Sequence, residues 1–398
     1  MKQTLAVAKA NTAVPSPVPM LDVTRENAQL GEEIVEAMAE VCRSGAFVHG
    51  PACGKLEKAV AEYCGVEHAI GCASGSDALL LALMVLGVGA GDEVILPSFT
   101  FFATAGAVWR LGATPVFVDI DARSFNLDPG QVLGKLTKAT KAIIPVHLFG
   151  QCAPMDEIRS IASAARGVPI IEDACQAIGA EYKGKRAGSL GTMGCLSFYP
   201  TKNLGGFGDG GMITTSDSEL AAKLRILRDH GQQPRYYHHY VGLNSRLDAL
   251  QAAVLGVKLP HLDRWARERE QHAAHYAAEF AMRGLGRELI GPPLDKHCRH
   301  VWNQYTVRVA GGRRDALHKY LAGRQIGSAI YYPVPLHLQK CFAPLGYREG
   351  SLPKTEQACR EVLSLPIYPE LSAAEQESVI DAVQSFCHEQ AKMGSQAA

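Results

Sequence analysis

The chain has 398 residues, of which 47% are hydrophobic and 20% charged, and its 40 basic side chains balance 40 acidic ones. That length is enough for about two or three domains with packed cores. A net charge of zero gives no electrostatic reason to expect a nucleic acid or an anionic membrane as a partner. Apolar runs are too short to span a bilayer, no secretory signal is evident, and the 11 cysteines form no C-x-x-C pair. We therefore expect a protein of the reducing cytoplasm, without a disulfide framework or a metal site.

In chain order, the first expected segment is a flexible arm, residues 1–18, rich in Ala, Thr, Pro and Ser. Helical periodicity follows over residues 32–42 and 55–64. From residue 67 to 217 short β-rich runs alternate with helical stretches, which predicts parallel βαβ units in a large domain of residues 19–250. Strands are expected at 93–96, 115–119, 142–146 and 168–172.

A smaller C-terminal domain is expected over residues 251–398. A helical stretch from 246 to 281, interrupted at Pro260, leads into it. Its predicted elements are a strand at 305–309 and helices at 314–323 and 373–387.

The segment around Lys202 is the most informative part of the chain. Residues 197–206 read Ser-Phe-Tyr-Pro-Thr-Lys-Asn-Leu-Gly-Gly. A lysine amine can form a Schiff base with a cofactor aldehyde, and glycines allow a tight turn close to a ligand. Upstream, residues 168–173 read as a buried strand that ends at Asp173, and ligands gather at the carboxyl ends of strands in open α/β sheets. Lys202 and Asp173 together predict a pyridoxal phosphate site.

Other segments supply what this cofactor needs, although each also has a structural interpretation. Ser74, Gly75 and Ser76 precede an apolar helix, whose N-terminus could bind a phosphate or could simply be capped. Asp173 could keep a pyridine nitrogen protonated, or could cap a helix after the strand. Gln176 could reach the ring hydroxyl. The aromatic run at 99–102 offers a flat apolar surface, but an aromatic cluster is by default core.

Seven segments, in a fixed order, resemble the DegT/DnrJ/EryC1/StrS family of sugar aminotransferases over about residues 19–387. They are residues 44–50, 74–79, 91–101, 145–150, 172–176, 197–203 and 242–248. The resemblance implies an α/β protein of fold-type I, like aspartate aminotransferase. Such a protein has a large domain with a mostly parallel sheet, a smaller α+β domain, and a homodimeric assembly with shared active sites.

The resemblance also implies roles for individual residues. Lys202 would form the Schiff base, Asp173 would pair with the pyridinium nitrogen, and Gln176 would lie near the ring hydroxyl. Phe101 would stack on the ring, and the phosphate would be held by Gly75, Ser76, Ser197 and, from the neighbouring subunit, Asn244. The residues expected near the sugar nucleotide are Arg246, Tyr331, Tyr332 and His337.

The function implied is transfer of an amino group from L-glutamate to a keto group of a nucleotide-linked sugar, at C3 or C4. Because the chain has Lys202 where some family members have His and act as dehydratases, transamination is favoured. Tyr331 stands where several members that act on 3-keto sugars have His, so the sugar stays open. Two alternatives are an aminotransferase acting on a free keto-inositol and a non-catalytic regulator that binds the cofactor.

Overall fold

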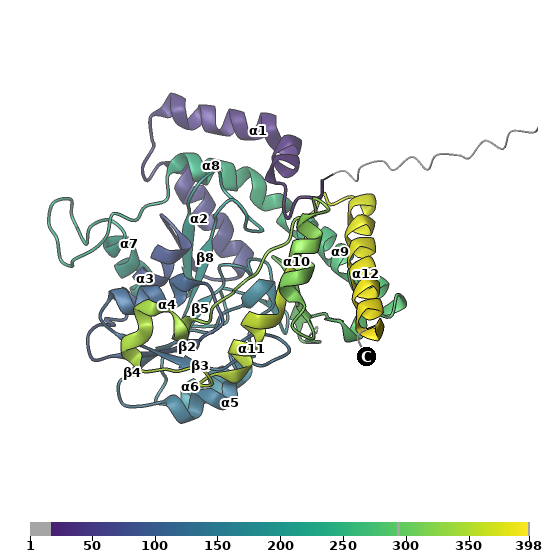
Figure 1. Cartoon of the computed structure of the whole chain (residues 1–398). Coiled ribbons are helices and arrows are strands. Elements are labelled where there is room, and N and C mark those ends of the chain that lie inside the picture. Colours follow the sequence, from purple (N-terminus) through teal and green to yellow (C-terminus); the bar gives the residue numbers. More distant parts are fainter. Residues whose placement is uncertain (1–16, 293–294, 397–398) are drawn as a thin grey trace, which may run out of the picture.

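The computed structural model describes residues 17–292 and 295–396, so most of the predicted arm lies outside the described residues. A central sheet organises the larger part of the chain (Figure 1). Its strands run in the order β3-β2-β4 and then β5-β8-β9-β1, and parallel bridges join the β4 segment to β5. All of them are parallel except β9, which is antiparallel to both β8 and β1. Their bounds are β1 His68–Cys72, β2 Glu93–Pro97, β3 Thr114–Val118, β4 Thr140–Ile143, β5 Ile171–Asp173, β8 Met193–Ser197 and β9 Gly211–Thr215.

Helices cover both faces of this sheet because its strands are apolar on both sides. Neighbouring strand residues such as Val94 and Ile95, or Met212 and Ile213, belong to different buried clusters. Strands buried on both faces are typical of parallel sheets with helices on each side. One face packs against α1 Val23–Ser44, α2 Pro51–Cys64, α5 Pro129–Val132, α6 Met155–Ala164 and α8 Ala249–Lys258, and the other against α3 Gly75–Val85, α4 Phe102–Arg110 and α7 Ser218–Leu227.

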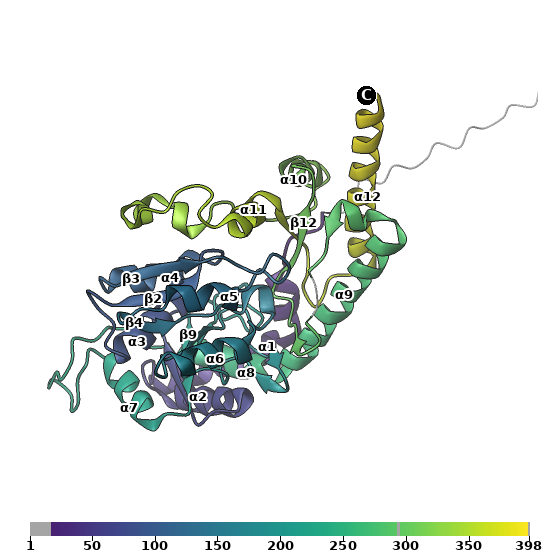
Figure 2. The same ribbon diagram turned by 90° about the horizontal axis from the view of Figure 1, so that it is seen from below.

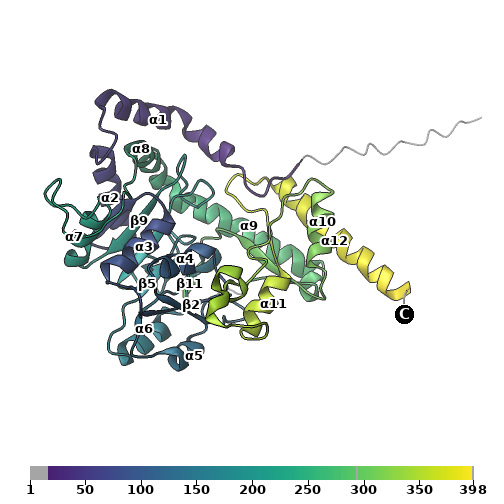
Figure 3. The same ribbon diagram turned by 60° about the vertical axis from the view of Figure 1, so that its left-hand side comes forward.

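A second sheet, of antiparallel strands, lies at the other end of the molecule from α7 (Figures 1 and 3). It contains β10 Leu289–Ile290, β12 Tyr305–Val309 and β13 Val362–Leu365, and it packs with α10 Arg314–Ala322 and α12 Ala373–Gln396. A small third sheet joins β6 Glu181–Tyr182 and β7 Lys185–Arg186 to β11 Cys298–Arg299. The predicted strand at 305–309 and helices at 314–323 and 373–387 are all present, and α12 continues beyond its predicted end.

The long helix α9, Leu262–Met282, connects the two parts and runs from beside α8 to α12 (Figure 2). Its first half contributes Trp265 to the core of the large sheet, and its second half contributes Tyr276 to the core of the small one. The predicted domain boundary between residues 250 and 251 falls inside α8, which is buried against the large sheet. We therefore propose a boundary within α9, between residues 266 and 273.

Part of the C-terminal sequence returns to the large sheet. Leu336, Phe342 and Leu352 are buried in the same cluster as α3 and α4. The first turn of the next helix, α11 Pro353–Glu361, lies against Asp119, whose carboxylate accepts hydrogen bonds from the backbone N–H groups of Lys354 at 3.0 Å and Thr355 at 2.8 Å. Asp119 thus stabilises a helix N-terminus. In the described part of the chain, no helix is long and apolar enough to cross a membrane.

Candidate active site

A pocket of about 650 Å³ lies at the carboxyl ends of β5 and β8 and beside the first turn of α3. Two segments of the C-terminal sequence, at residue 304 and at residues 331 and 332, close it from the other side. The structure brings together nine of the predicted site residues there: Gly75, Ser76, Phe101, Asp173, Gln176, Ser197, Lys202, Tyr331 and Tyr332.

Asp173 is fixed at the end of β5 by its backbone and by its side chain. Its N–H donates to the carbonyl of Pro145 at 2.9 Å, and its carbonyl accepts from the N–H of His147 at 3.0 Å. Its carboxylate is 5% exposed and accepts hydrogen bonds from the Thr104 hydroxyl at 2.7 Å and from the N–H of Cys175 at 3.3 Å. The side chain is therefore held in one orientation on the pocket wall.

The preceding residue, Glu172, points to the other face of β5 and anchors the strand there. Its carboxylate accepts from the backbone N–H groups of Gly188, Leu190 and Gly191 at 2.6–2.8 Å and lies 2.9 Å from Nε2 of His147. Nδ1 of His147 accepts from the N–H of Ala153 at 3.0 Å, so the proton of a neutral ring is on Nε2 and is donated to Glu172. Because four donors bond to the buried carboxylate of Glu172, the strand that carries Asp173 is held rigidly.

Lys202 lies in a tight turn that the glycines make possible. Its N–H donates to the carbonyl of Tyr199 at 2.8 Å, and the N–H of Gly206 donates to that of Phe198 at 2.8 Å. A Cβ on Gly205 would lie 2.3 Å from the carbonyl oxygen of Pro200, so no other residue fits there without a shift of the chain. Burial lowers the pKa of the Lys202 amine, against the smaller opposing effects of Cys175 and Asp173.

The first turn of α3 forms the opposite end of the pocket. The Ser74 side chain accepts the N–H of Asp77 at 3.1 Å and caps the helix, while the first N–H groups of any helix have no partner within it. A Cβ on Gly75 would lie 2.7 Å from Cβ of Ser197, so only glycine allows this close contact between the helix and β8. Backbone N–H groups and the helix dipole suit a phosphate at this end.

Gln176 and the aromatic residues lie between these two ends. The Gln176 side chain accepts the N–H of Phe149 at 2.8 Å and donates to the hydroxyl of Tyr332 at 3.0 Å. The ring of Phe101 is 56% exposed and its centroid lies 6.3 Å from that of Tyr332. Burial raises the pKa of both Tyr331 and Tyr332, which keeps their hydroxyls protonated as hydrogen-bond donors.

Three predicted site residues lie outside this pocket. Asn244 is exposed, and Arg246 pairs with Asp229 at 2.6 Å; their predicted role across a subunit interface stays a prediction. His337 is a buried residue, 1% exposed, and its ring lies 2.7 Å from the Ser98 hydroxyl and 3.2 Å from the Glu356 carboxylate. These bonds hold the chain after Pro335 against the end of β2, and the contact of His337 with the sugar stays a prediction.

The pocket also contains polar residues that the sequence analysis missed. Gln304 lines it from the start of the β12 segment, and Thr100 lines it from the loop before α4. Thr104 does not line the pocket but bonds to Asp173 from behind. Thr100 precedes α4 and Thr104 lies in its first turn, and no sequence pattern indicates a role at the pocket for either threonine or for Gln304.

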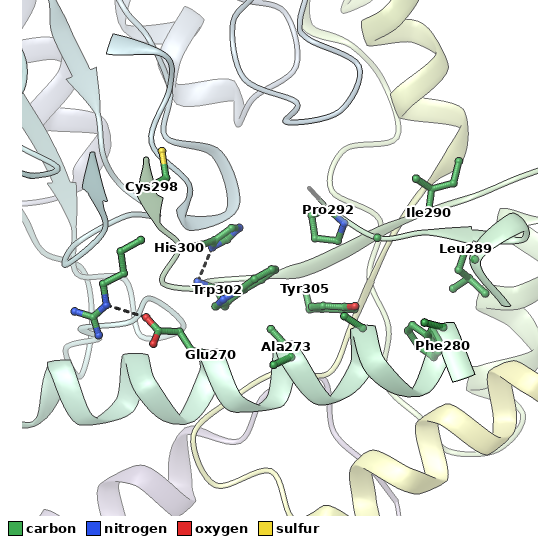
Figure 4. Close-up of a pocket in the computed structure, with 16 residues that line it drawn as sticks. Glu270, Ala273, Phe280, Leu289, Ile290, Pro292, Cys298, His300, Trp302 and Tyr305 are labelled. Atoms are coloured by element: carbon green, nitrogen blue, oxygen red, sulfur yellow. Dashed lines mark hydrogen bonds and ion pairs between the residues drawn. The ribbon is translucent and has the colours of Figure 1, made fainter. Parts of the chain in front are cut away.

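A second groove, of about 730 Å³, lies between α9 and the segment that carries β10 and β11 (Figure 4). Its floor is formed by small and aromatic residues of α9, such as Ala273 and Phe280, and Trp302 and Tyr305 face them. None of the predicted site residues lies in this groove. The described residues also contain no group of three or more His, Cys, Asp or Glu that could hold a metal ion.

Comparison with known proteins agrees with this geometry. Residues 28–384 match the DegT/DnrJ/EryC1/StrS aminotransferase family. A "pleiotropic regulatory protein" of Geobacillus stearothermophilus is 52% identical over 93% of this chain and 98% of its own length. The dTDP-3-amino-3,4,6-trideoxy-alpha-D-glucose transaminase of Streptomyces venezuelae is 45% identical over 93% of this chain and 96% of its own length. A UDP-N-acetyl-3-dehydro-alpha-D-glucosamine 3-aminotransferase of Acidithiobacillus ferrooxidans is 45% identical over 91% of this chain and 94% of its own length.

Solved structures agree as well. DesV of S. venezuelae, in complex with a ketimine intermediate, superimposes with a TM-score of 0.90 at 45% identity and covers 94% of this chain and 99% of its own. A Bacillus subtilis protein with bound pyridoxamine phosphate, NtdA, has a TM-score of 0.87 at 33% identity. The match covers 94% of this chain and 86% of NtdA.

The fold and these similarities define a fold-type I transaminase that uses pyridoxal phosphate. The chain belongs to the DegT/DnrJ/EryC1/StrS aminotransferase family.

Proposed function

We propose that this enzyme transfers an amino group from L-glutamate to the C3 keto group of a nucleotide-linked sugar, with C4 as the alternative position. The observation that carries the proposal is the placement of Lys202 and Asp173 on the walls of one pocket, with a helix N-terminus at its end. The names of the two relatives at 45% identity, both of which specify nitrogen at position 3 of a nucleotide sugar, support the substrate class and the position.

The residues of the pocket fit the cofactor at each of its functional groups. Pyridoxal phosphate supplies an aldehyde that reacts with amines and an electron-poor ring that withdraws charge from the neighbouring carbon. Lys202 would hold the aldehyde carbon covalently, since burial lowers the pKa of its amine and favours the neutral, nucleophilic form. Gly75, Ser76 and Ser197 would hold the phosphate, and Gln176 would bond the ring hydroxyl.

Two of these side chains, Asp173 and Lys202, would also hold or transfer protons. The Asp173 carboxylate would keep a proton on the ring nitrogen, because a negative charge beside that atom favours its protonated form. The Lys202 amine, once displaced by the amino donor, would carry a proton between the donor α-carbon and the cofactor carbon. Phe101, exposed on the pocket wall, would cover one face of the ring.

We further propose that the enzyme is a homodimer with shared sites. The single chain leaves several large aromatic side chains exposed, on the pocket wall, in the loop before α8 and in other segments, and exposed apolar surface is typical of interfaces. These aromatic residues are Phe47, Phe101, Phe102, Tyr199, Phe207, Tyr236, Tyr237 and Tyr240. Asn244 and Arg246 follow the same loop and would reach the phosphate and the sugar nucleotide of the other subunit. Tyr331 and Tyr332 would contact the sugar from their own subunit.

The test is the absorbance spectrum of the protein loaded with pyridoxal phosphate, before and after addition of L-glutamate. We expect the yellow band to fade and the pyridoxamine band to grow, and then to reverse with a 3-keto sugar nucleotide. Reversal with 4-keto sugars alone would move the position to C4, and reversal with scyllo-inosose alone would favour a keto-inositol substrate. A spectrum that no amino donor changes would contradict the proposal.

That last outcome would favour a regulatory role, for which the name of the relative at 52% identity is the supporting observation. A regulator that only binds the cofactor does not need the proton-carrying amine of Lys202. The presence of Lys202 and Asp173 in one pocket therefore favours catalysis.

A further inference from the structure

Thr104 is completely buried in the first turn of α4, and its hydroxyl lies 2.7 Å from Oδ2 of Asp173. It reaches Asp173 from behind the pocket wall and does not line the pocket. A buried hydroxyl has one proton to donate, so its other contacts decide where that proton goes.

Two further oxygens lie near the Thr104 hydroxyl. The carbonyl of Phe101 is 3.2 Å away and the hydroxyl of Thr100 is 3.1 Å away. The carbonyl of Phe101 also receives the backbone N–H of Thr104 at 3.3 Å. The carboxylate is the nearest acceptor and the only charged one, and hydrogen bonds to a charged acceptor are shorter and stronger. The proton of Thr104 therefore goes to Asp173, and Thr100 donates to Thr104.

We propose that Thr104 is a positioning residue whose hydroxyl fixes the orientation of the Asp173 carboxylate and occupies one of its oxygens, and thereby keeps the proton on the ring nitrogen of the cofactor. A hydrogen bond to the charged form of an acid favours that form. The bond from Thr104 also makes the carboxylate a weaker proton acceptor. The proton that lies between Asp173 and the ring nitrogen therefore stays on the nitrogen. The inference rests on the proposed pairing of Asp173 with the ring nitrogen.

The test replaces Thr104 in the holoenzyme and follows the ring nitrogen directly. Pyridoxal phosphate labelled with ¹⁵N in the ring reports by its NMR resonance whether that nitrogen carries a proton. Thr104→Val removes the hydroxyl and nearly keeps the shape, whereas Thr104→Ser keeps the hydroxyl and removes the methyl group. We expect the Val variant to shift the resonance towards the unprotonated position and to slow the reaction with glutamate about 10- to 100-fold, the value of one hydrogen bond to a charged group. The Ser variant should keep the wild-type resonance.

A wild-type resonance in Thr104→Val would overturn the inference, and so would a Ser variant that shifts as far as the Val variant. If Thr104→Val does not fold, as judged by near-UV circular dichroism, Thr104→Ala replaces it, because Ala cannot clash and favours a helix. The same shift is expected of the Ala variant, and an unchanged resonance there would refute the inference. Failure of the proposed function is distinguishable, since an unprotonated ring nitrogen in the wild-type enzyme would refute the role of Asp173 itself.

Discussion

At the scale of single residues, burial makes the Lys202 amine more reactive near neutral pH than a lysine in water. Removing the amine from water disfavours its charged form, so the pKa of Lys202 falls below the ordinary value of 10.5. A lower pKa means that a larger fraction of the amine is neutral at any pH below it. Only the neutral amine attacks an aldehyde.

This lowered pKa predicts how the apoenzyme takes up its cofactor. The rate of reconstitution with pyridoxal phosphate should rise with pH and level off above the pKa of Lys202. The midpoint of this rise should lie below 10.5. Stopped-flow absorbance at several pH values measures the midpoint. The reaction of the cofactor with Nα-acetyl-lysine in the same buffers is the control, because it contains the titration of the cofactor but not the burial. A midpoint equal to that of the control would contradict the prediction.

Replacement of the lysine tests its role in catalysis. Lys202→Ala should reduce turnover by at least about 1000-fold, since the amine acts both as nucleophile and as general acid and base. The fold should persist, because the turn is held by backbone bonds of Tyr199 and Phe198. Steady-state kinetics with glutamate and a keto sugar nucleotide measure the loss. Lys58→Ala, which replaces an exposed lysine of α2, should retain full activity; comparable turnover in the two variants would exclude the assignment.

The sequence predicted pocket residues where a residue type carries the proposed chemistry and missed those whose role depends on a partner. Lys202 and Asp173 could be assigned from a lysine before glycines and an acid at a strand end. Thr104 could not, since its role depends on a carboxylate 69 positions away. A histidine in a loop segment looks available, and the sequence could not indicate that the buried ring of His337 contacts Ser98 and Glu356.

At the scale of elements, glycines decide how closely α3 approaches the sheet. A Cβ on Gly211, the first residue of β9, would lie 2.3 Å from the carbonyl carbon of Ser74. Gly211→Ala must therefore separate β9 from the N-terminus of α3. We expect the free energy of unfolding to fall by about 1–3 kcal/mol, as in other overpacked cores, and the affinity for the cofactor to fall with it.

Urea denaturation and fluorescence titration with pyridoxal phosphate measure these two effects. The matched control is Gly54→Ala in α2, where an added Cβ meets nothing within 4 Å. That variant should be more stable by about 0.5–1 kcal/mol, because Ala favours a helix over Gly. Equal stability of the two variants would show that the contact at Gly211 relaxes at no cost.

Most elements could be predicted from periodicity, but their directions could not. The strands at 93–96, 115–119 and 168–172 appear within a few residues of their predicted ends. An apolar run does not state whether a strand is parallel or antiparallel, so nothing in the sequence indicated that β9 enters the sheet against its neighbours. The domain boundary stays a prediction for a related reason: the predicted position falls inside α8, and α9 is one continuous helix with a different core at each end.

At the scale of the whole molecule, the proposed shared sites predict that two inactive variants restore each other. In a mixture of Lys202→Ala and Arg246→Ala subunits, half of randomly assembled dimers are hybrids. Each hybrid has one site with both residues intact if Arg246 serves the other subunit. Refolded equimolar mixtures should then regain about a quarter of wild-type activity. If Arg246 serves its own subunit, no hybrid site is complete and the mixture should stay inactive.

The pairing of β1 with β9 has a consequence for synthesis of the chain. His68 lies opposite Thr215, so one edge of the sheet joins segments nearly 150 positions apart. While the chain leaves the ribosome, β1 emerges long before β9, its one partner among the described strands, and contacts between distant segments form late. The backbone N–H and C=O groups of β1 therefore stay unpaired, and its apolar side chains stay uncovered, while most of the large sheet is translated. We expect nascent chains arrested before residue 211 to bind general chaperones, and those arrested well beyond residue 215 to be released from them.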